Sequence, residues 1–416
     1  MRVLFLLHAH PDLQAGGTEI FARDLFRALH AFDVTGLFLA GTANHQRPPS
    51  PGTPFQAVGD MPDEVLMWSG GFDPFFLSQI DLHGVSRSLA ELLVQQQPDV
   101  IHVHHLLTIG VETVGLIRRI LPHARIVMTL HDYYPICAND GQMVTTAGAL
   151  CSSASPDVCK RCFPERSLTD FKLRELHIAG ALAMVDRFVA PSKFLRDRFV
   201  GWGLPAERIT TIANGLPSTH PTPHRQTARR DHFVFFGHVN RFKGSNVALE
   251  ASSMLSRQGV AHSLTLYGGT AHQTETTLAT FAAACEKAPQ AKYRGSYQRS
   301  ELPRLIGDAD WVVFPSKWWE NAPLVISEAL QHWRPVICSD IGGAAELVHD
   351  GVNGLTFPVG DAGSLAYSMR RAIEEPGLWQ RLVDGITPPP NIGQVAAQHA
   401  ELYSELLAIA AEPIAA

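Results

Sequence analysis

Glu320 and Glu328 are the residues with the clearest potential for chemistry, because they flank the start of a predicted helix. Residues 311–314 form an apolar strand pattern, a loop follows, and Pro323 stands at a typical first-turn position. Glu320 then precedes the helix and Glu328 lies on its second turn. A carboxylate in that place can accept two hydrogen bonds from a ribose diol, and the other can meet the hydroxyls of a second sugar. The alternative is a solvated helix face, but that face is otherwise apolar, so we expect one buried, ligand-bound glutamate.

Lys243 lies in a similar place, between a predicted strand over 233–236 and the next helix. The loop around it contains Gly237 and Gly244 and two further potential cations, His238 and Arg241. An ammonium group at the junction of strand and helix could neutralise a diphosphate. The alternative is an ordinary solvated lysine. The segment with the two glutamates favours the binding role instead.

The glycine pair Gly16-Gly17 follows the first predicted strand, over 3–7, and opens a helix with apolar residues on one face. Unhindered N–H groups at a helix start suit a phosphate or a sugar, although such a pair is also ordinary turn chemistry. Further along, His131 follows the predicted strand over 126–130 and is either a site residue or a loop histidine. Three more histidines leave a strand at the same expected sheet edge, where either an acceptor contact or a structural role would explain them: His102, His104 and His105.

The composition is that of an ordinary folded protein. The 416 residues are 45% hydrophobic and 18% charged, and this length predicts two or three domains. A net charge of −6 gives no electrostatic footprint for nucleic acid. The first apolar run is too short for a signal peptide, and no run reaches the roughly 18 residues of a membrane span. We therefore expect a cytoplasmic protein whose membrane contact, if any, is peripheral at the inner face.

Short apolar runs alternate with helical patterns along the chain, which predicts an α/β protein with parallel sheets. The expected strands fall into two sets: 3–7, 100–103, 126–130, 188–190, 233–236, 264–267, 311–314 and 336–338. A polar, proline-rich stretch over 217–231 is interpreted as an interdomain linker. Residues 41–75 are expected to be a long loop or an insertion that could carry short helices, and 393–411 a terminal helix. The predicted domains are 1–220 and 221–392, followed by a terminal segment over 393–416.

Taken together and in order, these motifs resemble the retaining glycosyltransferases of family 4, the glycosyl transferases group 1 with the GT-B fold. The resemblance covers nearly the whole chain. It includes the spaced pair Glu320 and Glu328, and it adds further segments in the family's order: Pro191-Ser192-Lys193, Asn214-Gly215, Pro315-Ser316 and Ser339-Asp340-Ile341-Gly342-Gly343-Ala344-Ala345-Glu346.

The resemblance implies two Rossmann-like domains facing across a cleft, with the last helix crossing back to the N-terminal domain. A nucleotide-sugar donor would be held mainly by the C-terminal domain and an acceptor by the N-terminal one. Glu328 would bind the ribose, Glu320 the donor hexose and Lys243 the diphosphate. The remaining donor-binding residues would be Gly16, Gly17, Gly237, His238 or Arg241, and, through backbone amides, Asn321, Ala322, Pro323 and Leu324.

Three details follow from comparing the chain with the family pattern. The family usually has Arg after the glycine at position 237, so either His238 or Arg241 takes that role. His131 matches the family's histidine near the donor sugar and the acceptor. The family generally works without a metal, and Asp308-Ala309-Asp310 precedes its strand, so we interpret it as a helix-to-strand turn and not as a manganese site.

Four of the six cysteines cluster, with 13, 7 and 2 residues between Cys137, Cys151, Cys159 and Cys162. A structural zinc site is one interpretation, and its place after His131-Asp132 would brace an acceptor-side loop. Unbound thiols and a disulfide or redox pair are the alternatives.

The expected function is retaining, metal-independent transfer of a hexose from a UDP- or GDP-sugar to a hydroxyl of a glycan or lipid-linked acceptor in surface polysaccharide biosynthesis. No cofactor is needed for catalysis. The sequence leaves open whether retention uses a covalent intermediate or a same-face attack. An epimerase or hydrolase on the same fold, and a non-catalytic nucleotide-sugar-binding partner of an assembly complex, are the alternatives.

Overall fold

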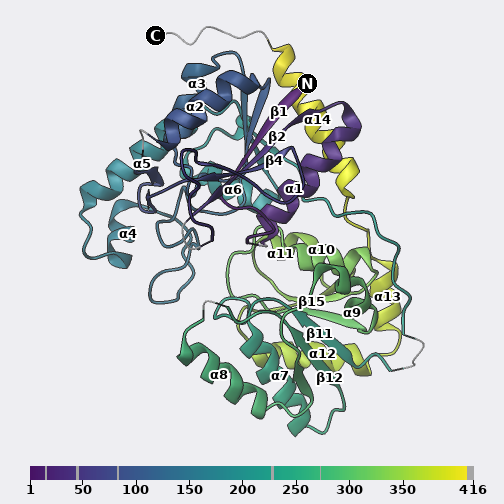
Figure 1. Cartoon of the computed structure of the whole chain (residues 1–416). Helices are drawn as coiled ribbons and strands as arrows, with labels where there is room; N and C mark the ends of the chain where they lie inside the picture. The colour runs from purple at the N-terminus through teal and green to yellow at the C-terminus, as the bar shows by residue number, and fades with distance from the viewer. Residues whose placement is uncertain (15, 44–45, 82–83, 226–228, 272, 410–416) are drawn as a thin grey trace. The chain divides into compact units, whose positions relative to one another are not determined.

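A computed structural model of the chain describes residues 1–14, 16–43, 46–81, 84–225, 229–271 and 273–409. It divides into two compact units (Figure 1). Unit 1 comprises Met1–Pro217 together with the chain from Pro390 onward, and unit 2 comprises Ser218–Pro389. The sequence placed these boundaries after 220 and after 392. Of the predicted terminal segment, residues 410–416 lie outside the described part.

Unit 1 is built on an eight-stranded sheet with the order β10-β9-β8-β7-β1-β2-β4-β3. Every pair in it is parallel except β3 with β4. A small antiparallel pair, β5 with β6, stands apart from it. The strands are β1 (Arg2–Leu7), β2 (Thr35–Thr42), β3 (Phe55–Ala57), β4 (Glu64–Trp68), β5 (Phe72–Asp73), β6 (Ser78–Gln79), β7 (Val100–Val103), β8 (Arg125–Thr129), β9 (Arg187–Ala190) and β10 (Ile209–Thr211).

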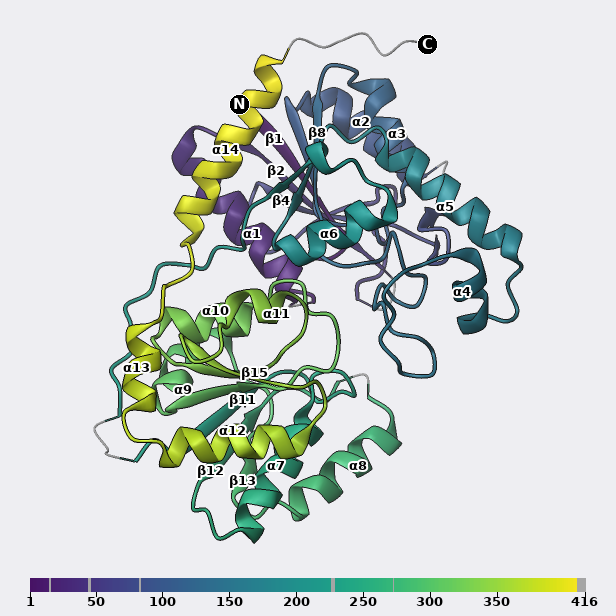
Figure 2. The same cartoon turned by 180° about the vertical axis from the view of Figure 1, so that it is seen from behind.

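Helices cover both faces of this sheet, as a parallel sheet with apolar side chains on both faces requires. Phe5 and Phe38 on one face pack against α1 and the C-terminal helix α14, which lie side by side. Helices α2, α3 and α5 lie on the opposite side (Figures 1 and 2). The unit 1 helices are α1 (Gly17–Leu29), α2 (Val85–Gln96), α3 (Glu112–Ile120), α4 (Pro156–Cys162), α5 (Leu168–Leu182), α6 (Lys193–Trp202) and α14 (Ile392–Ala408), with short 3-10 turns η1 (His30–Phe32) and η2 (Ala206–Arg208).

Unit 2 contains a six-stranded, fully parallel sheet with the order β13-β12-β11-β14-β15-β16. Residues alternate between two cores: Phe233 and Phe235 face α7 and α12, whereas Val234 and Phe236 face α9, α10 and α11. The strands are β11 (His232–Phe236), β12 (Ser263–Tyr267), β13 (Ala291–Tyr293), β14 (Trp311–Phe314), β15 (Val336–Ser339) and β16 (Gly354–Phe357). The helices are α7 (Ser245–Arg257), α8 (Glu275–Glu286), η3 (Arg299–Glu301), α9 (Leu302–Gly307), α10 (Leu324–Gln331), α11 (Gly342–Leu347), α12 (Ala362–Glu374) and α13 (Leu378–Asp384).

The prediction of a long loop with short helices over 41–75 is wrong. The described residues of that stretch contain β3, β4 and β5, together with the end of β2, and no helix. Strand β4 pairs in parallel with β2, which precedes it by more than 20 residues. This short strand lies between β2 and the edge strand β3 and is fixed by a distant partner rather than by its own pattern, and the Gly and Pro residues around it hide the strand signal.

The stretch over 217–231, interpreted as a linker, belongs mostly to unit 2, because the units join at its beginning. The buried guanidinium of Arg334 anchors it: Nη2 donates to the Pro223 carbonyl at 2.8 Å and Nη1 to the Thr222 carbonyl at 3.3 Å, while Nε donates to the Ala309 carbonyl at 2.9 Å. Contacts with residues far along the chain therefore make this polar, proline-rich stretch part of the domain.

The prediction of a helix-to-strand turn at 308–310 is confirmed, since α9 ends at Gly307 and β14 begins at Trp311. The buried carboxylate of Asp310 accepts hydrogen bonds from Arg225 at 2.8 Å and from Arg230 at 3.2 Å. These two arginines occupy the carboxylate that the sequence could suggest as a metal ligand.

No helix within the described residues combines the length and the apolar character needed to cross a bilayer.

Candidate active site

The central feature of unit 2 is a buried ion pair at the carboxyl edge of its sheet. Lys243, in the loop after β11, donates from Nζ to Oε1 of Glu320 at 2.7 Å. The same oxygen accepts from Ser316 Oγ at 2.9 Å and from Trp318 Nε1 at 2.7 Å, and Glu320 is only 6% exposed. Three donors on one oxygen fix the carboxylate as an anion in a single orientation. The structure thus brings together Lys243 and Glu320, which the sequence analysis named separately.

The loops that carry this pair interlock through their backbones. Asn240 Oδ1 accepts hydrogen bonds from the N–H groups of Phe242 and Lys243, both at 2.9 Å, which fixes the turn before the lysine. Gly244 follows with φ of 74°, and a Cβ atom there would lie 1.8 Å from the Pro315 carbonyl oxygen. Only glycine allows this approach, so the lysine loop lies directly on the loop that precedes Glu320.

Glu328 lies on the second turn of α10, as the sequence predicts, and is half-buried. Burial raises the pKa of its carboxyl group to about 7, against the opposing influence of Arg299. The pKa of the neighbouring Tyr297 is raised by burial of its phenol and by the charge of Glu328. Tyr297 and Arg299 lie in the segment before α9, and no motif in the sequence identified them as neighbours of Glu328.

The residues between the two glutamates form the entry to α10. Pro323 is the N-cap of the helix, one position before the predicted first turn, and it has no N–H group to present. The residues with an amide N–H at this helix start are therefore Asn321, Ala322 and Leu324. Gly343 packs against the backbone of this segment. Its N–H donates to the Glu320 carbonyl at 2.7 Å, and a Cβ atom on it would lie 1.8 Å from the Asn321 carbonyl oxygen.

His238 and Arg241, the two candidates for the family's arginine, are both exposed on the loop after β11. His238 follows Gly237. Gly268 packs closely against Gly237, because a Cβ atom on Gly268 would lie 1.8 Å from the Gly237 carbonyl oxygen. The guanidinium of Arg241 lies 4.5 Å from the centre of the Phe242 ring. The choice between the two side chains stays open at this point.

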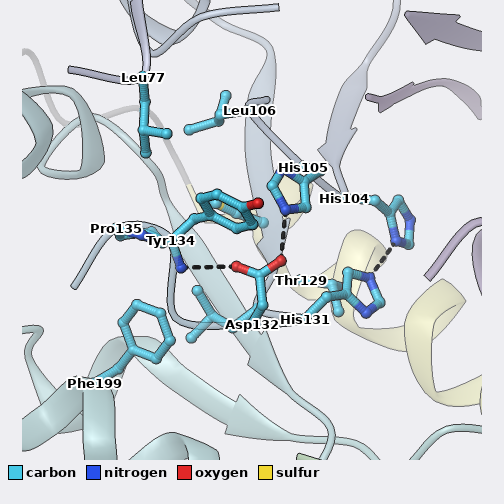
Figure 3. Close-up of a pocket in the computed structure, with 12 residues that line it drawn as sticks. Leu77, His104, His105, Leu106, Thr129, His131, Asp132, Tyr134, Pro135 and Phe199 are labelled. Atoms are coloured by element: carbon cyan, nitrogen blue, oxygen red, sulfur yellow. Dashed lines mark hydrogen bonds and ion pairs between the residues drawn. The ribbon is translucent and has the colours of Figure 1, made fainter. Parts of the chain in front are cut away.

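Unit 1 gathers histidines at the carboxyl edge of its own sheet (Figure 3). The neighbouring strands β1, β7 and β8 end there, and each is followed by site candidates. His104 Nδ1 lies 3.0 Å from His131 Nε2, and His105 Nε2 lies 2.5 Å from Asp132 Oδ2. These four residues line a pocket together with Leu77, Leu106, Met128, Thr129, Leu130, Tyr134, Pro135 and Phe199.

The imidazoles of His104 and His131 are neutral near pH 7. Burial, more than any other influence, lowers the pKa of His131 to about 3 and that of His104 well below its ordinary value. His102 is fully buried between Thr129 Oγ1 at 2.7 Å and the Tyr403 hydroxyl of α14 at 2.6 Å. Of the three histidines left open by the sequence, His102 is therefore structural, whereas His104 and His105 contact the residues after β8.

Gly16 and Gly17 open α1 as predicted, Gly16 as N-cap. The side chain of the buried Glu19 lies against this helix start. A Cβ atom on Gly16 would lie only 2.4 Å from Glu19 Oε2. Glu19 Oε1 lies 2.9 Å from His8 Nε2. Although burial favours the neutral acid, the hydrogen bond and charge of His8 lower the pKa of Glu19. A carboxylate thus already stands where the sequence analysis expected a phosphate, and only the position of Glu19 in the first helical turn hinted at this.

The four clustered cysteines, Cys137, Cys151, Cys159 and Cys162, line one pocket in unit 1. No disulfide joins them. As placed, no three His, Cys, Asp or Glu side chains within the described residues are arranged to hold a metal ion.

Two family models match the chain, one on each side of the junction between the units. The model "Glycosyltransferase Family 4" matches residues 15–219, and "Glycosyl transferases group 1" matches residues 221–385. Together they account for most of the chain.

Curated relatives are glycosyltransferases of modest identity. Alpha-D-kanosaminyltransferase of Streptomyces kanamyceticus is 23% identical over 49% of this chain and 56% of its own length. The amylovoran biosynthesis glycosyltransferase AmsK of Erwinia amylovora is 27% identical over 43% and 46%. D-inositol 3-phosphate glycosyltransferase of Arthrobacter sp. (strain FB24) is 26% identical over 96% and 91%. The match spans about half the length of the first curated relatives.

Solved structures share the fold along nearly the whole chain. Anabaena HepE in complex with UDP and glucose has a TM-score of 0.69 at 18% identity, covering 97% of this chain and 99% of that one. Sucrose-phosphate synthase of Thermosynechococcus elongatus has a TM-score of 0.72 at 19% identity, covering 98% and 100%. The predicted fold class, with two Rossmann-like parallel-sheet domains, is confirmed.

Proposed function

The chain belongs to the glycosyl transferases of group 1, with the GT-B fold, and we propose that it is a retaining, metal-independent hexosyltransferase. Its donor is a UDP- or GDP-sugar, and its acceptor is a hydroxyl of a glycan or lipid-linked sugar in surface polysaccharide biosynthesis. The observation that carries the proposal is the Lys243–Glu320 pair at the carboxyl edge of the unit 2 sheet, beside the start of α10.

The leaving group of such a reaction is a nucleoside diphosphate, whose developing negative charge needs stabilisation. The Lys243 ammonium supplies a positive charge, and the first turn of α10 supplies N–H groups with the positive end of the helix dipole. Preorganised donors of this kind stabilise a departing oxyanion without a metal ion. This chemistry is the reason for proposing metal independence.

The two glutamates suit the hydroxyls of the donor. All three hydrogen bonds to the Glu320 carboxylate reach Oε1, so within the described residues Oε2 remains an acceptor for a hexose hydroxyl. Glu328, at a pKa of about 7, is partly ionised near neutral pH, and only its ionised form accepts two hydrogen bonds from a ribose diol. The HepE structure contains UDP and glucose, and this supports a UDP-hexose among the donors to be tested.

The proposed contribution of His131 in unit 1 is hydrogen bonding rather than charge. His131 is neutral near pH 7 and is oriented by its 3.0 Å contact with His104, so it can bind a sugar hydroxyl without changing protonation state. Retention by a covalent intermediate and retention by same-face attack both agree with this arrangement. The pocket lined by His105, Asp132 and Tyr134 is the proposed place of the acceptor.

The acceptor and the location form the least specific part of the proposal. The relative AmsK is named for amylovoran biosynthesis, which supports a glycan acceptor. A lipid-linked acceptor remains in its bilayer, so a cytoplasmic enzyme would meet it by peripheral contact at the inner face. Cosedimentation with vesicles that contain a lipid-linked sugar, compared with plain vesicles, tests this contact.

The experiment is nucleoside diphosphate release from a panel of UDP-, GDP- and ADP-sugars, with and without a glycan acceptor, in the presence of EDTA. We expect release that depends on the acceptor, and a product with the donor's anomeric configuration by NMR. Glu320→Ala and Lys243→Ala should abolish turnover. Lys292→Ala, which removes an exposed lysine from the edge strand β13 of the same unit, is the matched control and should remain active.

Other outcomes would replace the proposal. Undiminished turnover in both site variants would refute the site assignment. Donor consumption without any acceptor would indicate an epimerase or hydrolase on this fold. Tight binding of a nucleotide sugar without turnover of any acceptor tried would indicate a non-catalytic binding partner.

A further inference from the structure

A pocket in unit 1 is lined by four cysteines that come from three separate pieces of backbone. Cys137 ends a short turn in which its N–H donates to the Tyr133 carbonyl, and Cys151 follows the bridge between Val144 and Leu150. The other two, Cys159 and Cys162, lie three residues apart on α4 and so share one helix face. The proposed transfer reaction uses none of these thiols.

The segment that carries these cysteines is long and has little regular structure. Between the end of β8 at Thr129 and the start of α4 at Pro156, the described chain contains no helix and no strand beyond the isolated bridge. A loop of this length inside a compact domain normally needs cross-links to remain ordered. The pocket lies where cross-links between the Cys137 turn, the Cys151 segment and α4 would meet.

Two of the thiol hydrogen bonds run to carbonyls two residues further along the chain. Cys137 Sγ donates to the Asn139 carbonyl at 3.9 Å, and Cys151 Sγ donates to the Ser153 carbonyl at 3.1 Å. A tetrahedral site would draw the four sulfur atoms into the pocket that their residues line.

A buried cation stands beside the cluster. The guanidinium of Arg174, on α5, donates to the carbonyls of Phe75 at 2.7 Å and Pro135 at 2.9 Å, and no carboxylate among the described residues pairs with it. The Pro135 carbonyl to which it donates lies two residues before Cys137. A buried cation without a carboxylate calls for an anion nearby, and thiolates bound to a metal would supply one.

We propose that Cys137, Cys151, Cys159 and Cys162 bind one zinc ion as a tetrahedral tetrathiolate that braces the loop after His131-Asp132. Zinc takes four thiolate sulfurs in closed structural sites. Binding displaces the four thiol protons to solvent, so the site carries a net charge of −2, next to the Arg174 cation. The site is structural, so it is separate from the transfer reaction and does not depend on the proposed function.

A redox pair is a weaker explanation of the same pocket. A redox pair needs two of these cysteines and not four, and no disulfide joins any of them.

The first test is the metal content of the full-length chain, purified without chelator or added metal and measured by plasma mass spectrometry. We expect one zinc ion per chain. Cys151→Ser and Cys159→Ser should contain about tenfold less zinc, because loss of one thiolate ligand weakens the site strongly. Cys285→Ser is the matched control: Cys285 is a half-buried cysteine on α8 of unit 2, and this variant should contain the full amount.

A second measurement is independent of whether the cysteine variants fold. Wild-type chain stripped with a thiol reagent and chelator should, on addition of cobalt(II), develop thiolate charge-transfer and intense d–d absorption that saturates at one ion per chain. Zinc well below one per chain combined with no such absorption would overturn the proposal. So would a disulfide between any two of the four residues in freshly purified protein. Neither result depends on nucleoside diphosphate release. The zinc proposal and the proposed function can therefore be refuted independently of each other.

Discussion

The carboxyl edges of the two sheets differ in their electrostatic character. In unit 2 a lysine and a glutamate form a charged pair at 2.7 Å, next to the start of α10. In unit 1 the edge carries His104 and His131, whose imidazoles lie 3.0 Å apart and are kept neutral by burial. The same strand-then-helix architecture thus supports a phosphate-binding chemistry in one unit and a hydroxyl-binding chemistry in the other. What differs is the residues that follow each strand, not the fold.

The largest effect is expected from removing the charge of unit 2. Lys243→Ala deletes the one ammonium in contact with Glu320, and loss of such a preorganised donor should lower kcat by roughly 10²–10³-fold. Steady-state release of nucleoside diphosphate measures this. Lys292→Ala should change kcat by less than about twofold, as is usual for an exposed side chain. Equal activity of wild type and Lys243→Ala would mean that the charged pair is only structural.

The neutral side of the comparison is tested by His131→Gln, which retains hydrogen-bonding groups but not the imidazole geometry. We expect kcat to fall by roughly tenfold to 10²-fold, as for loss of one oriented hydrogen bond. His123→Gln, at an exposed turn, is the control. Because the pKa of His131 is about 3, its neutral form persists across pH 6–8, and the defect should be the same at every pH in that range. A defect that varies with pH would instead indicate proton transfer by His131.

Glu328 should give unit 2 a pH dependence that unit 1 lacks. Its pKa of about 7 lies above the ordinary value of 4.5, so the carboxylate loses its charge as pH falls through 7. About nine-tenths is ionised at pH 8 and about one-tenth at pH 6, so the donor KM should rise by up to roughly tenfold on that descent while kcat changes less. Glu328→Gln should have a high donor KM that no longer varies with pH. A wild-type KM that stays constant from pH 8 to pH 6 would disprove the ribose role.

The smallest effect concerns the position where the family usually has arginine. His238 directly follows Gly237 at the sheet edge, whereas the Arg241 guanidinium lies against the Phe242 ring. We therefore expect His238→Ala to lower kcat/KM for the donor by about fivefold, as for one modest hydrogen bond, and Arg241→Ala to lower it less. The reverse order would assign the role to Arg241.

The fold could be predicted from sequence where the signal is local. The apolar runs that precede His8, Lys243 and Pro315 are continuous and buried, and each is a strand. Strand β4 was missed because its partner β2 lies far back in the chain. The place of residues 218–225 was missed because Arg334, more than 100 residues later, provides the anchor.

The candidate site shows the same division between local and distant information. The order of motifs identified Glu320, Glu328 and Lys243, but no spacing rule says that Lys243 reaches Glu320 across 77 positions. Ser316 and Trp318 lie within the same motif as Glu320, yet their hydrogen bonds to it depend on how the loop turns back. Glu19 was overlooked because an acidic residue in a first helical turn is common, and only the close approach to Gly16 reveals that it covers the helix start.

The most direct test of the charged edge of unit 2 is calorimetric titration of UDP and of GDP, in the presence of EDTA, into wild type, Lys243→Ala and Lys292→Ala. The account predicts that one of the two nucleotides binds wild type and Lys292→Ala equally without a metal ion, and binds Lys243→Ala about tenfold or more weakly, as loss of a charge-assisted contact requires. Equal affinity for wild type and Lys243→Ala, or binding that needs a divalent cation, would contradict it.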